Sequence, residues 1–88
     1  MNKKSKTAEK PDELLSKKRG RRVKIAIGRT GKNQKDFALD DLHTSQQHLS
    51  GIVTGKHNLT RDNAERIAAA AGVRVEWLLC DDDFMTTE

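Results

Sequence analysis

The stretch from Asn33 to Gly55 constrains the fold more than any other part of the chain. It reads NQKDFALDDLHTSQQHLSGIVTG. Its hydrophobic spacing predicts a helix over about 34–42, a corner at His43-Thr44 and a second helix over about 45–53. Gly55 follows the second helix, where a glycine suits a left-handed C-terminal cap. The stretch is therefore predicted to form two short helices that meet at a tight corner.

The second helix of this pair has a polar outer side. Thr44 is a good N-cap, and Gln47 three residues later completes a T-x-x-Q capping box. Leu49 and Ile52 are three residues apart, so they can share a buried face. Four polar residues are then left on the outer side, namely Ser45, Gln46, Gln47 and Ser50. Because a glutamine amide can donate to and accept from the edge of one adenine, this row favours sequence-specific DNA binding.

Basic residues are concentrated in the first part of the chain. The 17 Lys and Arg against 13 Asp and Glu give a formal net charge of +4, and most of the cations lie within residues 1–35. The other end is acidic, with three aspartates at 81–83, so a polyanionic partner fits the basic half. The segment 17–22 either wraps DNA or enters its minor groove as an arm, or is simply solvated. Its basic residues are Lys17, Lys18, Arg19, Arg21 and Arg22.

The remaining segments predict further short helices. Residues 1–11 are polar and are expected to form a flexible, disordered basic arm. A helix follows from about residue 12 to 29, with Gly20 weakening its middle. Thr60 caps another helix, which Gly72 ends, and a last short helix covers 76–79. We therefore expect an all-α, compact five-helix domain over residues 12–80, followed by an acidic flexible tail over 81–88.

Composition also limits where the protein is expected to work. The single cysteine, Cys80, cannot form an internal disulfide, which fits a reducing compartment. No apolar stretch is long enough to span a bilayer, and no apolar region follows the charged N-terminus as in a secretory signal. We expect a soluble, cytoplasmic and nucleoid-associated protein with no membrane partner.

No pattern of catalytic or metal-binding residues stands out. His43, His48, His57 and Cys80 lack the spacing of a zinc site. The sequence has no phosphate-binding P-loop, no H-E-x-x-H motif and no plausible Ser/His/Asp set. We therefore expect no enzyme activity, no metal site and no cofactor.

Taken in order, these motifs resemble the Xre/Cro family of helix-turn-helix repressors, and more narrowly the lambdoid phage repressors. Residues 33–38, which begin with NQ and end with FA, resemble the opening of the family's first motif helix. The run TSQQ at 44–47 is similar to the start of the recognition helix in 434-like members. Residues 72–79, with GV at the start and EWLL at the end, resemble the family's last helix. The resemblance covers about residues 22–79.

The resemblance implies a lambda repressor-like domain whose second motif helix lies in the major groove of double-stranded DNA. It implies a transcriptional regulator of the phage or prophage repressor type, which binds a palindromic operator as a homodimer formed before or on the DNA. The base-reading residues would be Gln46, Gln47 and Ser50. The phosphate contacts would come from Asn33, Gln34, Ser45, Lys56, His57 and Asn58.

The last predicted helix holds the candidates for a dimer contact. Trp77 and Leu78 would provide apolar surface there, and family repressors bind two half-sites about one helical turn apart. The alternative is that the Trp77 ring packs inside its own monomer.

Three features depart from the family pattern. The stretch between Ala38 and Thr44 is one residue longer and lacks the family's turn glycine, so either the first motif helix is extended or the corner is reshaped. Gly51 falls at the third base-reading position and has no side chain, so the operator sequence cannot be carried over. The basic extension before Arg22 is longer than in a minimal family member.

Two other functions remain open. The antitoxin of a toxin–antitoxin pair would use the same fold and bind a small protein partner through a charged tail. A protein-interaction adaptor would use the helical bundle without reading DNA. Its binding would not respond to salt or to the substitution Gln46→Ala.

Overall fold

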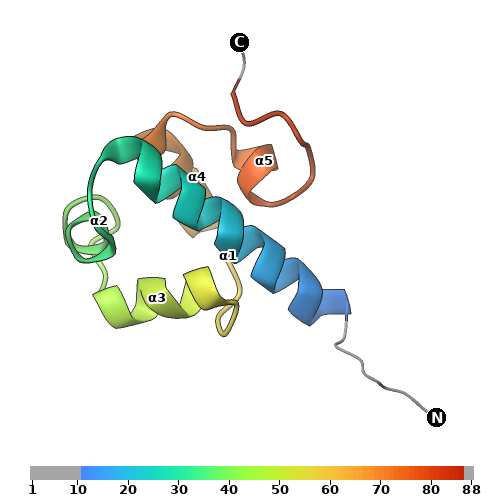
Figure 1. The fold of residues 1–88 in the computed structure, drawn as a ribbon, viewed down its shortest axis with the longest axis horizontal. Coiled ribbons are helices and arrows are strands. Elements are labelled where there is room, and N and C mark those ends of the chain that lie inside the picture. The colour runs from blue at the N-terminus through green and yellow to red at the C-terminus, as the bar shows by residue number, and fades with distance from the viewer. Residues whose placement is uncertain (1–10, 87–88) are drawn as a thin grey trace.

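The computed structural model of the protein describes residues 11–86. Within this range the chain contains no strand and forms five helices, which confirms the predicted all-α class (Figure 1). They are α1 (Pro11–Thr30), α2 (Gln34–Asp40), α3 (Gln46–Thr54), α4 (Arg61–Ala71) and α5 (Val75–Leu78). The central helix is α1, which packs against α3, α4 and α5, while α2 packs against α3. None of the described helices is both long and apolar enough to cross a bilayer.

The first helix begins at Pro11, a residue that suits a first helical turn, and runs unbroken through Gly20. The predicted arm over residues 1–11 otherwise lies outside the described residues. Gly20 is buried where α1 crosses α3. A β-carbon there would overlap the carbonyl oxygen of Val53 and lie 2.6 Å from that of Ile52. A glycine at this position therefore lets the two backbones approach closely.

The corner between α2 and α3 lies between Asp40 and Gln46, and α2 does not reach residue 42. The helix ends at Asp40, two residues before the predicted end. The Leu42 amide then donates to the carbonyl oxygen of Phe37 at 3.3 Å, and the Thr44 amide donates to that of Ala38 at 2.9 Å. These backbone bonds satisfy carbonyls at the end of α2 and close the corner.

The N-cap of α3 is Ser45 and not Thr44, so the predicted capping box is wrong. Ser45 Oγ accepts a hydrogen bond from the His48 amide at 3.0 Å. Thr44 is not the N-cap, because it lies one residue before Ser45, inside the corner. It directly follows His43, whose φ of 54° is left-handed. Gln47 is consequently the second residue of the helix and not the third, where a capping box needs it.

The core is built mainly from aliphatic and small side chains, together with Phe37 and Trp77. Leu49 and Ile52 are 0 % and 1 % exposed, which confirms the predicted buried face of α3. Thr60 caps α4 and Gly72 ends it in a left-handed conformation, also as predicted. The other large side chains that are fully buried are Val23, Ile67 and Leu78.

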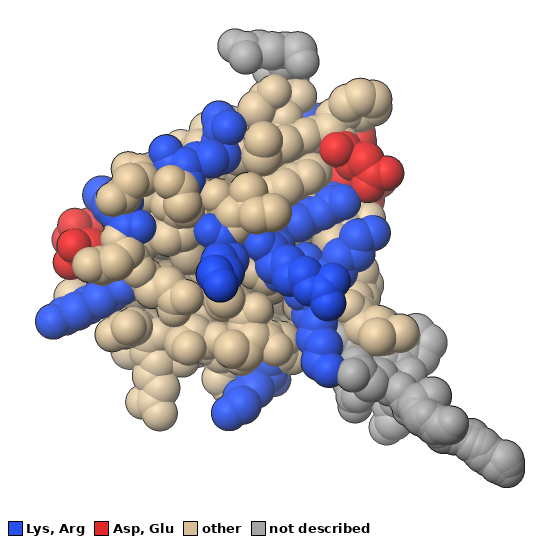
Figure 2. Space-filling view, viewed as in Figure 1, with Lys and Arg blue, Asp and Glu red and all other residues tan. Residues whose placement is uncertain are grey.

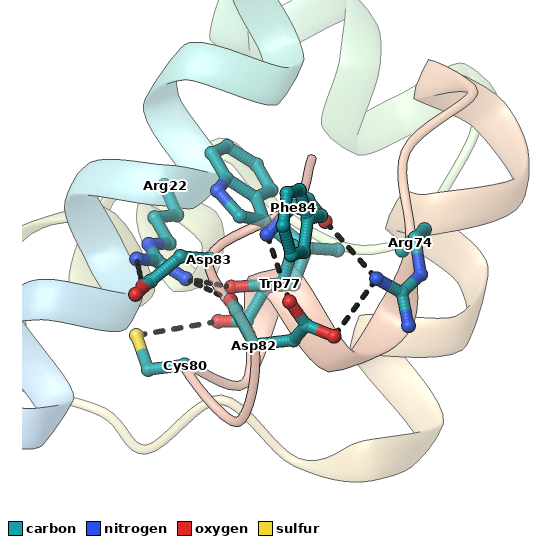
Figure 3. A network of polar contacts seen from close by, with 8 residues as sticks. Arg22, Arg74, Trp77, Cys80, Asp82, Asp83 and Phe84 are labelled. Carbon is teal, nitrogen blue, oxygen red and sulfur yellow. Dashed lines mark hydrogen bonds and ion pairs between the residues drawn. The ribbon is translucent and has the colours of Figure 1, made fainter. Parts of the chain in front are cut away.

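The acidic C-terminal segment folds back onto the domain (Figure 3). The Arg22 guanidinium donates to the carbonyl oxygens of Trp77 at 2.7 Å and Asp82 at 2.8 Å, and pairs with Asp83 at 2.9 Å. Arg74 pairs with Asp82 at 2.9 Å. The segment predicted as a flexible tail over 81–88 therefore makes specific contacts over 81–85, and two arginines face its carboxylates. Residues 87–88 lie outside the described range.

Candidate nucleic-acid interface

An open groove of about 510 Å³ lies on the outer side of α3 and the loop that follows it. All three predicted base-reading residues line this groove, together with two of the predicted phosphate contacts. The structure thus gathers on one concave surface residues that the sequence analysis selected from different positions. The lining consists of Gln46, Gln47, Ser50, Gly51, Thr54, Lys56 and His57.

Helical spacing explains why these side chains face outward. Gln46 and Ser50 are four residues apart on one side of α3, while Leu49 and Ile52 point into the core. Gln46 and Gln47 are exposed, and Ser50 is partly exposed. Neither α3 nor the lining of the groove contains Asp or Glu. The surface therefore offers amide and hydroxyl groups without a carboxylate that would repel a polyanion.

The space beside Gly51 in this groove is occupied by the His57 ring, which the sequence did not predict. A β-carbon on Gly51 would overlap Cδ2 of His57 and lie 2.6 Å from its Nε2. The His57 amide donates to the Gly51 carbonyl oxygen at 3.1 Å. The His57 ring also stacks on the His48 ring, with centroids 5.2 Å apart and planes at 20°. The missing side chain at position 51 was the only signal in the sequence that another residue could fill this space.

The other predicted phosphate contacts lie outside the lining of the groove. Asn33 caps α2, with Oδ1 accepting from the Asp36 amide at 2.8 Å. Ser45 caps α3 in the same way. Gln34 is partly buried in the first turn of α2, whereas Asn58 is exposed in the loop after α3. Two of these four side chains therefore have a structural role in starting the helices of the corner.

The basic cluster predicted as an arm is part of α1 instead. Figure 2 shows Lys and Arg side chains gathered on the face of the molecule along which α1 runs. Lys18 and Arg21 are exposed there. Arg19 and Arg22 are three residues apart and turn towards the C-terminal segment, where Arg19 Nε donates to the Leu79 carbonyl oxygen at 2.9 Å. These two arginines hold the protein together, so the five residues do not form one arm.

The first residue of this cluster lies beside the end of α3. A β-carbon on Gly55 would be 3.1 Å from the Cα of Lys17 and 2.7 Å from its Cγ. One residue earlier, the buried Ser16 hydroxyl donates to the Gly55 carbonyl oxygen at 3.1 Å. The basic turn of α1 is therefore adjacent to the loop that carries Lys56 and His57.

Two aspartates at the end of α2, Asp40 and Asp41, lie beside a lysine. Lys32 Nζ lies 3.1 Å from Asp41 Oδ2 and 3.8 Å from Asp40 Oδ2. The hydrogen bond that Lys32 donates to Asp41 raises the pKa of Lys32 above its ordinary value. The Asp40 and Asp41 carboxylates thus face a positive charge at neutral pH.

The residues predicted as a dimer contact are covered within the monomer. Trp77 is 7 % exposed and Leu78 is 0 % exposed. The Arg22 guanidinium stands 5.2 Å from the centroid of the Trp77 ring, a distance that suits a cation–π contact. This burial matches the alternative in which Trp77 packs inside its own monomer, and it leaves these two side chains little surface for a partner.

Within residues 11–86, no group of three or more His, Cys, Asp or Glu side chains is arranged to hold a metal ion. No protein-family model matches the chain, and no curated protein matches it. Any assignment of function therefore depends on the residues and the geometry described above.

Proposed function

We propose that the protein is a sequence-specific DNA-binding transcriptional regulator in which α2, the corner and α3 form a helix-turn-helix motif. The observation that carries this proposal is the set of polar side chains on the outer surface of α3. Gln46, Gln47 and Ser50 share one groove with Lys56, and no carboxylate lines it. A helix with its side chains is about 10–12 Å wide and the major groove of B-DNA is about 12 Å wide, so α3 can enter it.

Each polar residue of this surface has a distinct role in the proposal. Gln46 and Gln47, in the first turn of α3, contact base edges, as the first residues of a recognition helix do. A bidentate contact of this kind discriminates against a wrong base by about 1–3 kcal/mol. Ser50 lies one turn further along the groove. Lys56 and Asn58 contact phosphates, which positions the protein without reading sequence.

The backbone of the corner supports the family resemblance at one position. His43 occupies the region where the resembled family carries its turn glycine, and its φ of 54° is left-handed. A glycine adopts that conformation at low cost, and histidine is among the residues enriched there. Aligned in this way with the resembled family, the chain would carry its extra residue before His43.

By the same resemblance we propose a repressor of the phage or prophage type. Two copies would bind a palindromic operator whose half-sites are about 34–36 Å apart, and bound protein would block transcription. Because Trp77 and Leu78 are buried, we propose that the two copies associate on the operator through another surface.

The proposal is tested by selection from a pool of randomised DNA duplexes, followed by sequencing, at two salt concentrations. The proteins compared are the wild type and the variant Gln46→Ala/Gln47→Ala. Asn63→Ala is the matched control, because it removes an amide from α4, which packs on α1 and α5. We expect a palindromic motif for the wild type and the control, and a blurred motif for the double variant.

Other outcomes would point to the other functions. Weak binding without a motif, lost equally by all three proteins at higher salt, would mean that the charge is generic and that DNA is not the specific ligand. A small protein that co-purifies with this chain, wrapped by its charged tail, would favour an antitoxin. A protein partner whose affinity ignores both salt and Gln46→Ala would favour an adaptor.

A further inference from the structure

The recognition surface of α3 has a gap in its row of side chains. Position 51 lies four residues after Gln47, so its side chain would stand next to that of Gln47 on the same face of the helix. The residue there is Gly51, which has nothing to contribute. A protein that reads bases only from α3 would therefore lose one contact at this point of the groove.

The structure fills this gap from outside the helix. The imidazole of His57 occupies the space that a side chain on Gly51 would need, since a β-carbon there would lie 2.6 Å from Nε2 and overlap Cδ2. His57 lines the groove together with Gln46 and Gln47. The loop after α3 thus places a side chain where the helix itself has none.

The His57 ring is held in this position from two directions. Its backbone amide donates to the Gly51 carbonyl oxygen at 3.1 Å, which fixes the loop against the helix. Its ring stacks on His48, whose own place is set by the helical turn that begins at Ser45. A side chain that is ordered before binding loses less entropy on contact than one that must be arrested.

We propose that His57 is a base-reading residue, which replaces the side chain absent from Gly51 and contacts a guanine edge in the major groove. The inference rests on the proposed function and changes the role of His57 from phosphate contact to determinant of specificity. Guanine presents two adjacent acceptors, N7 and O6, and an imidazole N–H can donate to them. Adenine presents an amino donor beside its N7, so the same N–H finds a second acceptor nearby only on guanine.

The test compares base preferences of the wild type, His57→Ala and Lys56→Gln by the same duplex selection. In His57→Ala we expect the preference for guanine at one position of each half-site to fall by about fivefold or more, with the other positions unchanged. Lys56→Gln is the control for a phosphate contact, and it should weaken binding to all sequences alike and lower the salt dependence.

A second variant tests the same base position while leaving His57 in the sequence. In Gly51→Ala the new β-carbon displaces the ring, and the alanine favours the helix, so α3 is retained. The preference lost in Gly51→Ala should be at the position lost in His57→Ala. Circular dichroism of both variants is the control for folding, and we expect spectra like that of the wild type.

Three results would overturn the inference. A wild-type motif that persists unchanged in His57→Ala would do so while leaving the proposed function intact. Uniform weakening in His57→Ala, as in Lys56→Gln, would assign His57 to a phosphate. The absence of any motif for the wild type would reject both the proposed function and this inference.

Discussion

At the scale of single residues, two glycines of this protein differ in what an added β-carbon would contact. Gly20 faces backbone carbonyl oxygens of α3, which cannot move without moving the helix. Gly51 faces the ring of a histidine side chain, so an added β-carbon would displace a side chain and not the backbone. The same substitution to alanine is therefore expected to affect stability at the first position and the shape of the groove at the second.

The first of these expectations gives a stability prediction. Gly20→Ala should destabilise the protein by about 1–3 kcal/mol, because the overlap with backbone exceeds the gain in helix propensity of about 0.5–1 kcal/mol. Gly28→Ala is the control in the same helix, since no atom lies within 4 Å of its β-carbon position. It should be neutral or stabilising. Denaturant unfolding measures both, and a stabilised Gly20→Ala would refute the close crossing of α1 and α3.

The sequence predicted individual side chains well where a local pattern determines them. The burial of Leu49 and Ile52 and the exposure of Gln46 and Gln47 all follow from the period of one helix. His57 was predicted only as a phosphate contact, and its packing against Gly51 was not predicted because that contact forms across a turn. No periodicity describes such a contact.

At the scale of elements, the corner between α2 and α3 decides how the candidate interface is presented. The sequence predicted a corner between two helices here, but it did not predict the residues at which the helices end and begin. The side-chain pattern allowed α2 to reach residue 42, and the structure ends it at Asp40. The end of α2 is determined by backbone hydrogen bonds to Phe37 and Ala38 and by the left-handed conformation of His43. Neither feature could be predicted from the sequence pattern.

This corner makes a prediction about helix capping. Ser45→Ala should cost about 1 kcal/mol of stability, because it leaves the His48 amide without its acceptor. Thr44→Ala should cost much less, since the described contacts of Thr44 in the corner use its backbone amide. Thermal or urea unfolding of the two variants compares them directly. A larger loss for Thr44→Ala would restore the capping box and contradict the corner described here.

At the scale of the whole molecule, α1 connects the candidate interface to the C-terminal segment. On one side, Ser16 and Gly20 of α1 contact the end of α3 and the residue that follows it. Arg19 and Arg22 of the same helix (Figure 1) donate to carbonyl oxygens of residues that follow α5, and Figure 3 shows the contacts of Arg22. The sequence did not predict the second set of contacts. They join residues about sixty positions apart, and charge alone indicated only an acidic end.

The C-terminal contacts predict a dependence on acid. The Phe84 amide and then the Arg74 guanidinium hold the pKa of Asp82 below its ordinary value of 3.8. A lowered pKa in the folded state means that the contact stabilises fully above pH 3.8 and is lost as the pH falls through the lower, folded value. Carbon-13 NMR of the Asp82 carboxyl should give a midpoint below 3.8, and Arg74→Gln should raise it. A midpoint at or above 3.8 in the wild type would contradict these contacts.

The central claim is that the outer face of α3 is the surface that meets DNA. The most direct measurement is an NMR titration of the labelled protein with a short DNA duplex at low salt, which follows backbone and side-chain amides. We predict the largest shifts at the side-chain amides of Gln46 and Gln47 and at the backbone amides of Ser50, Gly51 and His57, with small shifts in α4. Shifts confined to α4, α5 or the C-terminal segment, with α3 unchanged, would contradict the account.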